Sequence, residues 1–95
     1  MKYVTIDGDT MILSVPGNYK FSLTKAIDSE VQTAYQSGCA KVVVDFNNTV
    51  TMDSASLRQL TKIYRQVKSE NFSAKNAHGL VLAVLRQNDL ESWLR

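Results

Sequence analysis

The first part of the chain alternates apolar and polar residues. Residues 3–6 and 11–15 are rich in residue types that favour extended strands. Between them, residues 7–10 contain Asp and Gly, which adopt turn conformations easily. The pattern predicts an opening β-hairpin whose second strand is ended by Pro16 and the polar residues after it.

A helical spacing follows from Ser22. Apolar residues recur every three or four positions, with polar and charged residues between them, and this spacing indicates an amphipathic helix. Ser22 is a residue type suited to the N-cap, and Gly38 lies where a C-cap glycine belongs. The recurring positions, apolar except for Glu30, are Leu23, Ala26, Ile27, Glu30, Val31, Ala34 and Tyr35.

Two later runs, residues 41–46 and 79–85, are apolar without alternation. Runs of this kind are typical of central strands in a sheet that is covered on both faces. We therefore predict two central strands, with residues 42–44 and Leu82 deeply buried. The polar residues 69–79 between the runs predict a loop.

Two further helices are predicted. One begins at Ser54, and a short one covers residues 88–94, with Asn88 or Asp89 as its cap. The apolar face of the former comprises Leu57, Leu60, Ile63, Tyr64 and Val67.

These elements give the order β-β-α-β-α-β-α within one domain of residues 1–95, ending in a short helix. Crossovers that contain helices imply parallel strand pairs with right-handed connections, whereas the opening hairpin is antiparallel. The prediction is an α/β fold with a mixed β-sheet.

Composition narrows the function classes. A net charge of +2 is too small to indicate a nucleic-acid-binding protein. No apolar run is long enough for a membrane helix, and the N-terminus does not resemble a signal peptide. Because the single Cys39 cannot form an internal disulfide, we predict a structural thiol and a cytoplasmic protein.

The sequence gives little support for a metal site or a catalytic site. The single His78 and single Cys39 lack a ligand-spaced motif, so we predict no metal and no cofactor. A triad of Ser54, His78 and Asp53 is rejected because Asp53 and Ser54 are adjacent and no nucleophile-elbow glycines flank the serine. We expect a protein that is not an enzyme.

The remaining feature is the start of the second predicted helix. Thr49, Thr51, Asp53 and Ser54 bring hydroxyl and carboxylate groups toward the free backbone N–H groups of that helix. The simplest interpretation is capping, in which Asp53 or Ser54 accepts an N–H and stabilises the helix by about 1 kcal/mol.

The segment VVVDFNNTVTMDSASLRQL resembles the core of STAS domains, the family of bacterial anti-sigma-factor antagonists. In that family a hydrophobic strand ending near an Asp leads through a loop to an Asp-Ser pair that opens the second helix. The resemblance extends over nearly the whole chain, with residues 79–85 as the last strand and 89–94 as the following helix. The chain departs from the family in its short C-terminal helix and in Ser56, which stands where glycine is usual.

The resemblance implies that a partner kinase phosphorylates Ser54, with Ser56 as the second choice. It also implies that Asp53 is the acidic residue before the phosphorylated serine and that Leu57 is the apolar residue that anchors the helix. It implies a serine protein kinase or anti-sigma-type partner for the unmodified form and a PPM-type phosphatase for the phosphorylated form.

Independently of the resemblance, Ser54, Arg58, Lys62 and Arg65 recur at helical spacing, which predicts a basic stripe that leads away from Ser54. Arg58 lies one turn from Ser54 and can reach a phosphate there.

Two other interpretations of the function stay open: a STAS subunit in constant contact with an ABC-type transport complex, and a small α/β enzyme. The predicted partner-binding surface comprises Asp53, Ser54, Ala55, Ser56, Arg58, Lys62 and Arg65.

Overall fold

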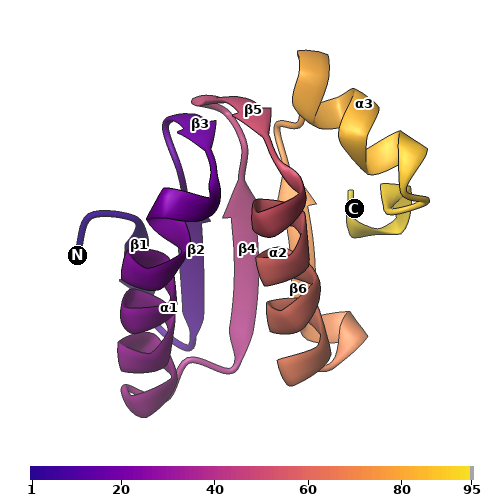
Figure 1. Ribbon diagram of the computed structural model, residues 1–95. Coiled ribbons are helices and arrows are strands. Elements are labelled where there is room, and N and C mark those ends of the chain that lie inside the picture. The colour runs from indigo at the N-terminus through magenta and orange to yellow at the C-terminus, as the bar shows by residue number, and fades with distance from the viewer. Residues whose placement is uncertain (95) are drawn as a thin grey trace.

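A computed structural model describes residues 1–94 and confirms the predicted order of the main elements (Figure 1). Two short strands and two 3₁₀ turns, which the sequence did not predict, lie between them. The main elements are β1 (Val4–Asp7), β2 (Thr10–Ser14), α1 (Phe21–Gln36), β4 (Lys41–Asp45), α2 (Ser54–Gln66), β6 (Phe72–Lys75) and α3 (Gly79–Gln87). The additional elements are β3 (Gly17–Tyr19), β5 (Thr49–Met52), η1 (Ser69–Asn71) and η2 (Glu91–Trp93).

The main sheet is mixed, as predicted. Its strand order is β1-β2-β4-β6, in which the β1–β2 hairpin is antiparallel and the other two pairs are parallel. The short strands β3 and β5 form a separate parallel pair. Because β3 directly precedes α1 and β5 directly precedes α2, this pair brings the N-termini of the two helices together.

The helices α1 and α2 lie over the same face of the main sheet (Figure 1). On the central strand β4, Val42 and Val44 are buried on that face, whereas Val43 is only half-buried. The prediction that all three valines are deeply buried is therefore wrong for Val43. Successive side chains of a strand point to opposite faces, and the face that carries Val43 is less well covered.

The last strand lies earlier in the chain than predicted. Residues 72–75 form β6 within the predicted loop, with Phe72 and Ala74 buried. Residues 79–85, predicted as a strand, begin α3. Gly79 has a φ of +53°, a left-handed conformation that glycine adopts readily, so the chain does not continue extended there.

Burial along α3 follows a helical period. Val81 and Leu85, four residues apart, are fully buried, whereas Leu80 is 61% exposed. Leu82 is half-buried, so the prediction of its deep burial is also wrong.

The end of the chain closes the core without the predicted helix over residues 88–94. Only the 3₁₀ turn η2 forms there, and Asn88 is the C-cap of α3 instead of the cap of a new helix. The Trp93 ring packs against the rings of Phe72 and Tyr64, with centroids 4.9 and 5.6 Å away. This contact joins η2 to β6 and α2.

The other local predictions are largely confirmed. Gly38 has a φ of +96° just after α1 and Cys39 is buried, as expected. However, α1 begins at Phe21, and Ser22 is not its N-cap. On α2, the predicted apolar face packs into the core, with Leu60 and Ile63 fully buried.

Candidate functional site

The predicted site lies at the start of α2, beside the start of α1. Asp53 is the N-cap of α2. Its Oδ1 accepts a hydrogen bond of 2.8 Å from the backbone N–H of Ser56, and its own N–H donates to the Ser56 hydroxyl at 3.0 Å. This reciprocal pair is a capping box, with serine in the place that Glu or Gln usually takes. Of the two residues that the sequence left open as the cap, the structure selects Asp53 over Ser54.

The same carboxylate also caps α1. Asp53 Oδ2 accepts a hydrogen bond of 2.9 Å from the backbone N–H of Phe21, the first residue of α1. The N-cap residue of α1, Lys20, makes no capping bond with its side chain. Asp53 therefore joins the starts of two helices that are 32 residues apart in the sequence.

These hydrogen bonds favour the charged form of Asp53. The bond from the Ser56 backbone contributes most to lowering the pKa of the carboxyl, and the Phe21 backbone, the Ser56 hydroxyl and the Ala55 backbone add to the effect. The carboxyl consequently has a pKa below the ordinary 3.8 and is ionised at neutral pH.

The two candidate serines have opposite environments. Ser54 is the first residue of α2 and is exposed, and within residues 1–94 its hydroxyl makes no hydrogen bond. Ser56 is fully buried, and its hydroxyl also donates to the Asp53 carbonyl at 2.7 Å. A partner can reach the exposed Ser54 hydroxyl. The Ser56 hydroxyl is enclosed in the cap and does not face a partner.

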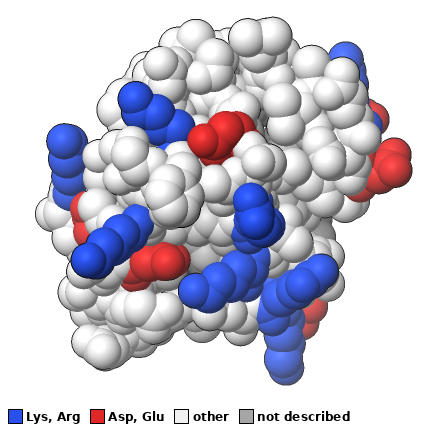
Figure 2. Space-filling view, in the orientation of Figure 1, with Lys and Arg blue, Asp and Glu red and all other residues white. Residues whose placement is uncertain are grey.

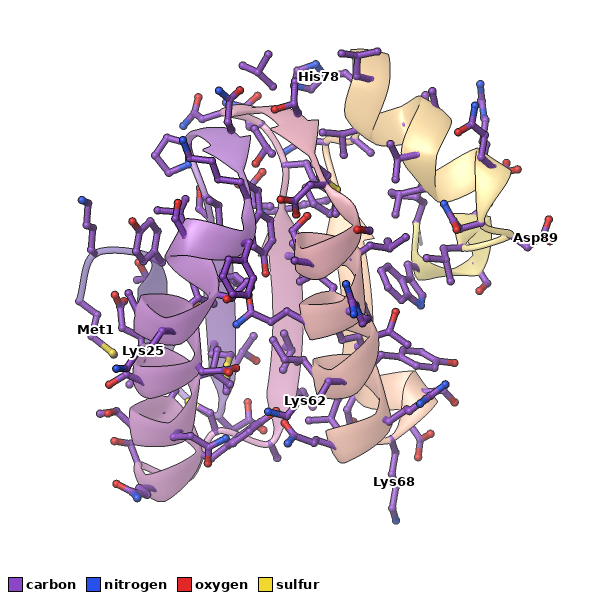
Figure 3. All side chains as sticks on the ribbon, in the orientation of Figure 1. Met1, Lys25, Lys62, Lys68, His78 and Asp89 are labelled. Atoms are coloured by element: carbon purple, nitrogen blue, oxygen red, sulfur yellow. The ribbon has the colours of Figure 1, made fainter. Side chains whose placement is uncertain are left out.

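The basic stripe predicted along α2 is present. Arg58, Lys62 and Arg65 are all exposed, and Figure 2 shows lysine and arginine side chains over α2, whereas carboxylates lie among the charges over α1. Lys62 reaches from α2 toward α1, where its Nζ lies 3.8 Å from a carboxylate oxygen of Asp28 (Figure 3). Among residues 1–94, neither Arg58 nor Arg65 takes part in an ion pair.

Sequence reasoning missed two residues beside the stripe. Phe21 is 73% exposed at the start of α1, and Gln59 is buried beneath the contact between the two helices. The signal for Phe21 was a large apolar residue just before a predicted helix. Nothing in the spacing distinguishes Gln59 from the other polar residues of α2.

Residues 1–94 contain no group of His, Cys, Asp and Glu side chains arranged to hold a metal ion. His78 lies before α3, and its Nε2 is 3.1 Å from the Asn47 carbonyl oxygen, so its observed contact is not with Ser54. No helix in this part of the chain is long and apolar enough to cross a membrane.

Comparison with known proteins identifies relatives of the fold. A family model described as Mlab, STAS domain, matches residues 3–95. The unphosphorylated form of the anti-sigma factor antagonist SpoIIAA superposes with a TM-score of 0.81 at 17% identity, over 97% of this chain and 84% of that chain. A Thermotoga maritima protein classed with the anti-sigma factor antagonists gives 0.82 at 19% identity, over 97% and 81%. The phosphorylated form of the Bacillus cell fate determinant SpoIIAA gives 0.75 at 16% identity, over 97% and 86%. A search of curated protein sequences finds no significant match.

Proposed function

We propose that this chain, which belongs to the STAS domain family, is a phosphorylation-controlled protein-binding switch of the anti-sigma-factor-antagonist type. It binds a serine protein kinase or anti-sigma-type partner while Ser54 is unmodified and releases that partner when Ser54 is phosphorylated. A PPM-type phosphatase restores the binding form. The chain acts by binding, without catalysis of its own.

The observation that supports this proposal is the exposed Ser54 hydroxyl, which is not engaged in the helix cap. Capping is carried out by Asp53 and Ser56. Because the fold does not use the Ser54 hydroxyl, it can be modified without loss of a hydrogen bond. Ser56 lacks this freedom, since phosphorylation there would break the capping box.

The expected effect of the phosphate is on binding and not on the fold. A phosphoserine adds about −1.5 to −2 charges. At a helix N-terminus an anion is favoured by about 0.3–1 kcal/mol, although the ionised Asp53 next to it opposes this gain. In a partner interface, burial of the phosphate dianion beside the Asp53 carboxylate would cost several kcal/mol, and each ~1.4 kcal/mol is tenfold in affinity.

Two substitutions test the proposal. The partner is first captured with the wild-type protein and identified by mass spectrometry; its affinity is then measured for Ser54→Asp, Ser54→Ala and a control, Ser29→Asp, which adds the same charge at an exposed position on α1. Ser54→Asp should melt like wild type and lose about tenfold or more in affinity. Ser54→Ala should bind normally and no longer be labelled by the kinase.

Other results would contradict the proposed phosphorylation switch. If Ser54→Asp binds like wild type and no phosphate is found on Ser54, the switch is wrong. Constant co-purification with a transport ATPase in that case would support the non-phosphorylated STAS subunit instead. Label on Ser56 that survives Ser54→Ala would refute the choice of serine.

A further inference from the structure

A groove runs between α1 and α2 from the side of Ser54. It encloses about 320 Å³, and both helices supply its walls. Its lining residues are Phe21, Thr24 and Asp28 of α1 and Ala55, Arg58, Gln59 and Lys62 of α2.

The floor of this groove is the Gln59 side chain, whose polar groups all have hydrogen-bond partners. The Gln59 side chain is buried; its Nε2 donates to the Thr24 carbonyl at 2.7 Å and to Asp28 Oδ1 at 3.0 Å, and its Oε1 accepts from the Tyr19 hydroxyl. Because these bonds hold α1 and α2 at a fixed separation, the groove is preformed and costs little ordering when it is filled.

The rim of the groove combines an apolar and a cationic group. Phe21 is 73% exposed, yet the bond from its N–H to Asp53 fixes its backbone. Arg58 is exposed on the opposite wall and takes part in no ion pair within residues 1–94. An exposed aromatic ring and an available guanidinium are the side-chain types that most often dominate protein interfaces.

We propose that this groove docks an acidic segment of the partner protein, which places a large apolar side chain on Phe21 and a carboxylate on Arg58. The inference rests on the proposed function for the existence of a partner and adds the chemistry by which it is recognised. Charge complementarity selects this occupant. Three cations of α2, Arg58, Lys62 and Arg65, attract an acidic chain. The carboxylates beside the groove are already engaged, since Asp28 is held by Gln59 and faces Lys62, and Asp53 caps both helices.

The same geometry explains how a phosphate would act. Arg58 lies four residues after Ser54 on α2, a spacing at which side chains are neighbours on a helix. A phosphate on Ser54 would therefore compete with the partner's carboxylate for the Arg58 guanidinium. Phosphorylation would repel the acidic segment and also remove its cationic contact.

The test uses a synthetic amphipathic peptide of leucine and glutamate as the probe for the unmodified full chain. Its binding is mapped by amide chemical shifts, with a leucine–lysine and a serine–glutamate peptide as controls. The expected map centres on Phe21, Thr24, Ala55 and Arg58, and only the leucine–glutamate peptide should bind well. Arg58→Glu should raise the Kd about tenfold or more, and Phe21→Ser should also raise it.

Arg65→Glu is the matched control, because it reverses the same charge on the same helix outside the groove. It should change the Kd less than about twofold. The groove proposal is wrong if Arg58→Glu and Arg65→Glu weaken binding equally. It is also wrong if the serine–glutamate peptide binds as well as the leucine–glutamate peptide, or if no peptide binds. Anionic vesicles that bind as tightly and are as sensitive to Arg58→Glu would also overturn it, in favour of a lipid surface.

These outcomes are separable from failure of the proposed function. If Ser54→Asp fails to affect the captured partner while the peptide still maps to the groove, only the phosphorylation switch is wrong. If Ser54→Asp weakens partner binding while the peptide does not bind or binds elsewhere, only the groove is wrong.

Discussion

At the scale of single residues, Asp53 stabilises the starts of both helices. One of its carboxylate oxygens caps α2 and the other caps α1. A side chain next to a proposed phosphorylation site would ordinarily be expected to contact the partner. Here both oxygens of the Asp53 carboxylate accept hydrogen bonds within the fold, whereas Ser54 and Arg58 are exposed and can be reached by a partner.

This division predicts different stabilities for two neighbouring substitutions. Loss of an Asp N-cap typically costs ~1 kcal/mol, so Asp53→Ala, which removes two caps, should lower the free energy of unfolding by about 2 kcal/mol. Ser54→Ala should change it by less than about 0.5 kcal/mol, because the Ser54 hydroxyl makes no bond in the described chain. Urea unfolding of both variants measures the difference. Equal losses would mean that Ser54 contributes to the cap after all.

The lowered pKa of Asp53 also predicts a dependence of stability on pH. A carboxyl whose pKa is lower in the folded state stabilises the fold above its unfolded pKa, near 3.8, and this contribution is lost as the pH falls through the folded value. Asp53→Asn keeps a capping oxygen but cannot ionise, so its stability should decline less than that of wild type in acid. Asp45, whose pKa is lowered mainly by its bond from Asn76, should leave part of the decline in both proteins. Parallel curves below pH 3.8 would contradict this account of Asp53.

At the scale of elements, the sequence predicted the first two thirds of the fold and misplaced the last. The hairpin follows from its strand-forming runs and turn, α1 and α2 follow from helical spacing, and β4 follows from an unbroken apolar run. The run over residues 79–85 had no polar residue to reveal its period, and an unbroken apolar run fits a buried strand and a helix equally. The true strand β6 is only four residues long, with a serine and a lysine among them, and so resembled a loop.

The helical period of α3 predicts a contrast between two leucines. Leu85 is fully buried and Leu80 is 61% exposed. Leu85→Ala should therefore cost about 2–5 kcal/mol of stability, whereas Leu80→Ala should cost about 0.5 kcal/mol or less. Urea denaturation of this pair, identical in chemistry, measures the effect of burial alone. A larger loss for Leu80→Ala would indicate a different register for this segment.

The local arrangement of the candidate site could be predicted together with α2, because Asp53, Ser54 and Arg58 lie close together in the sequence. The order of Asp53, Ser54 and Arg58 can be read from a helix start, and the structure places them as expected along α2. The contacts of Asp53 with Phe21 and of Gln59 with Thr24 span more than 30 residues. Such contacts arise from the packing of α1 against α2, which no local pattern encodes.

At the scale of the whole molecule, the aromatic contact that closes the core lies away from the proposed binding surface. The core is closed by Trp93 against Phe72 and Tyr64, at the side of β6 and α2. The proposed binding surface lies over α1 and α2, where Arg58, Lys62 and Arg65 line the exposed side of α2 (Figure 2). A modification at Ser54 can therefore change the surface charge without disturbing the residues that hold the sheet together.

This separation predicts how salt affects the partner complex. An overall net charge of +2 gives little long-range attraction, but the clustering of Arg58, Lys62 and Arg65 on one helix creates a local positive field. Because exposed charges mainly steer association and are screened within ~10 Å at 0.1 M salt, raising the salt should slow association far more than it speeds dissociation. Stopped-flow binding of the captured partner across a salt series measures both rates, with the melting temperature as a control on the fold. Arg65 lies outside the groove, so Arg65→Glu should lower the association rate by less than about twofold and leave dissociation nearly unchanged. Arg58→Glu should change both rates. Association rates that do not depend on salt would show that the partner is recognised by shape and apolar contact alone.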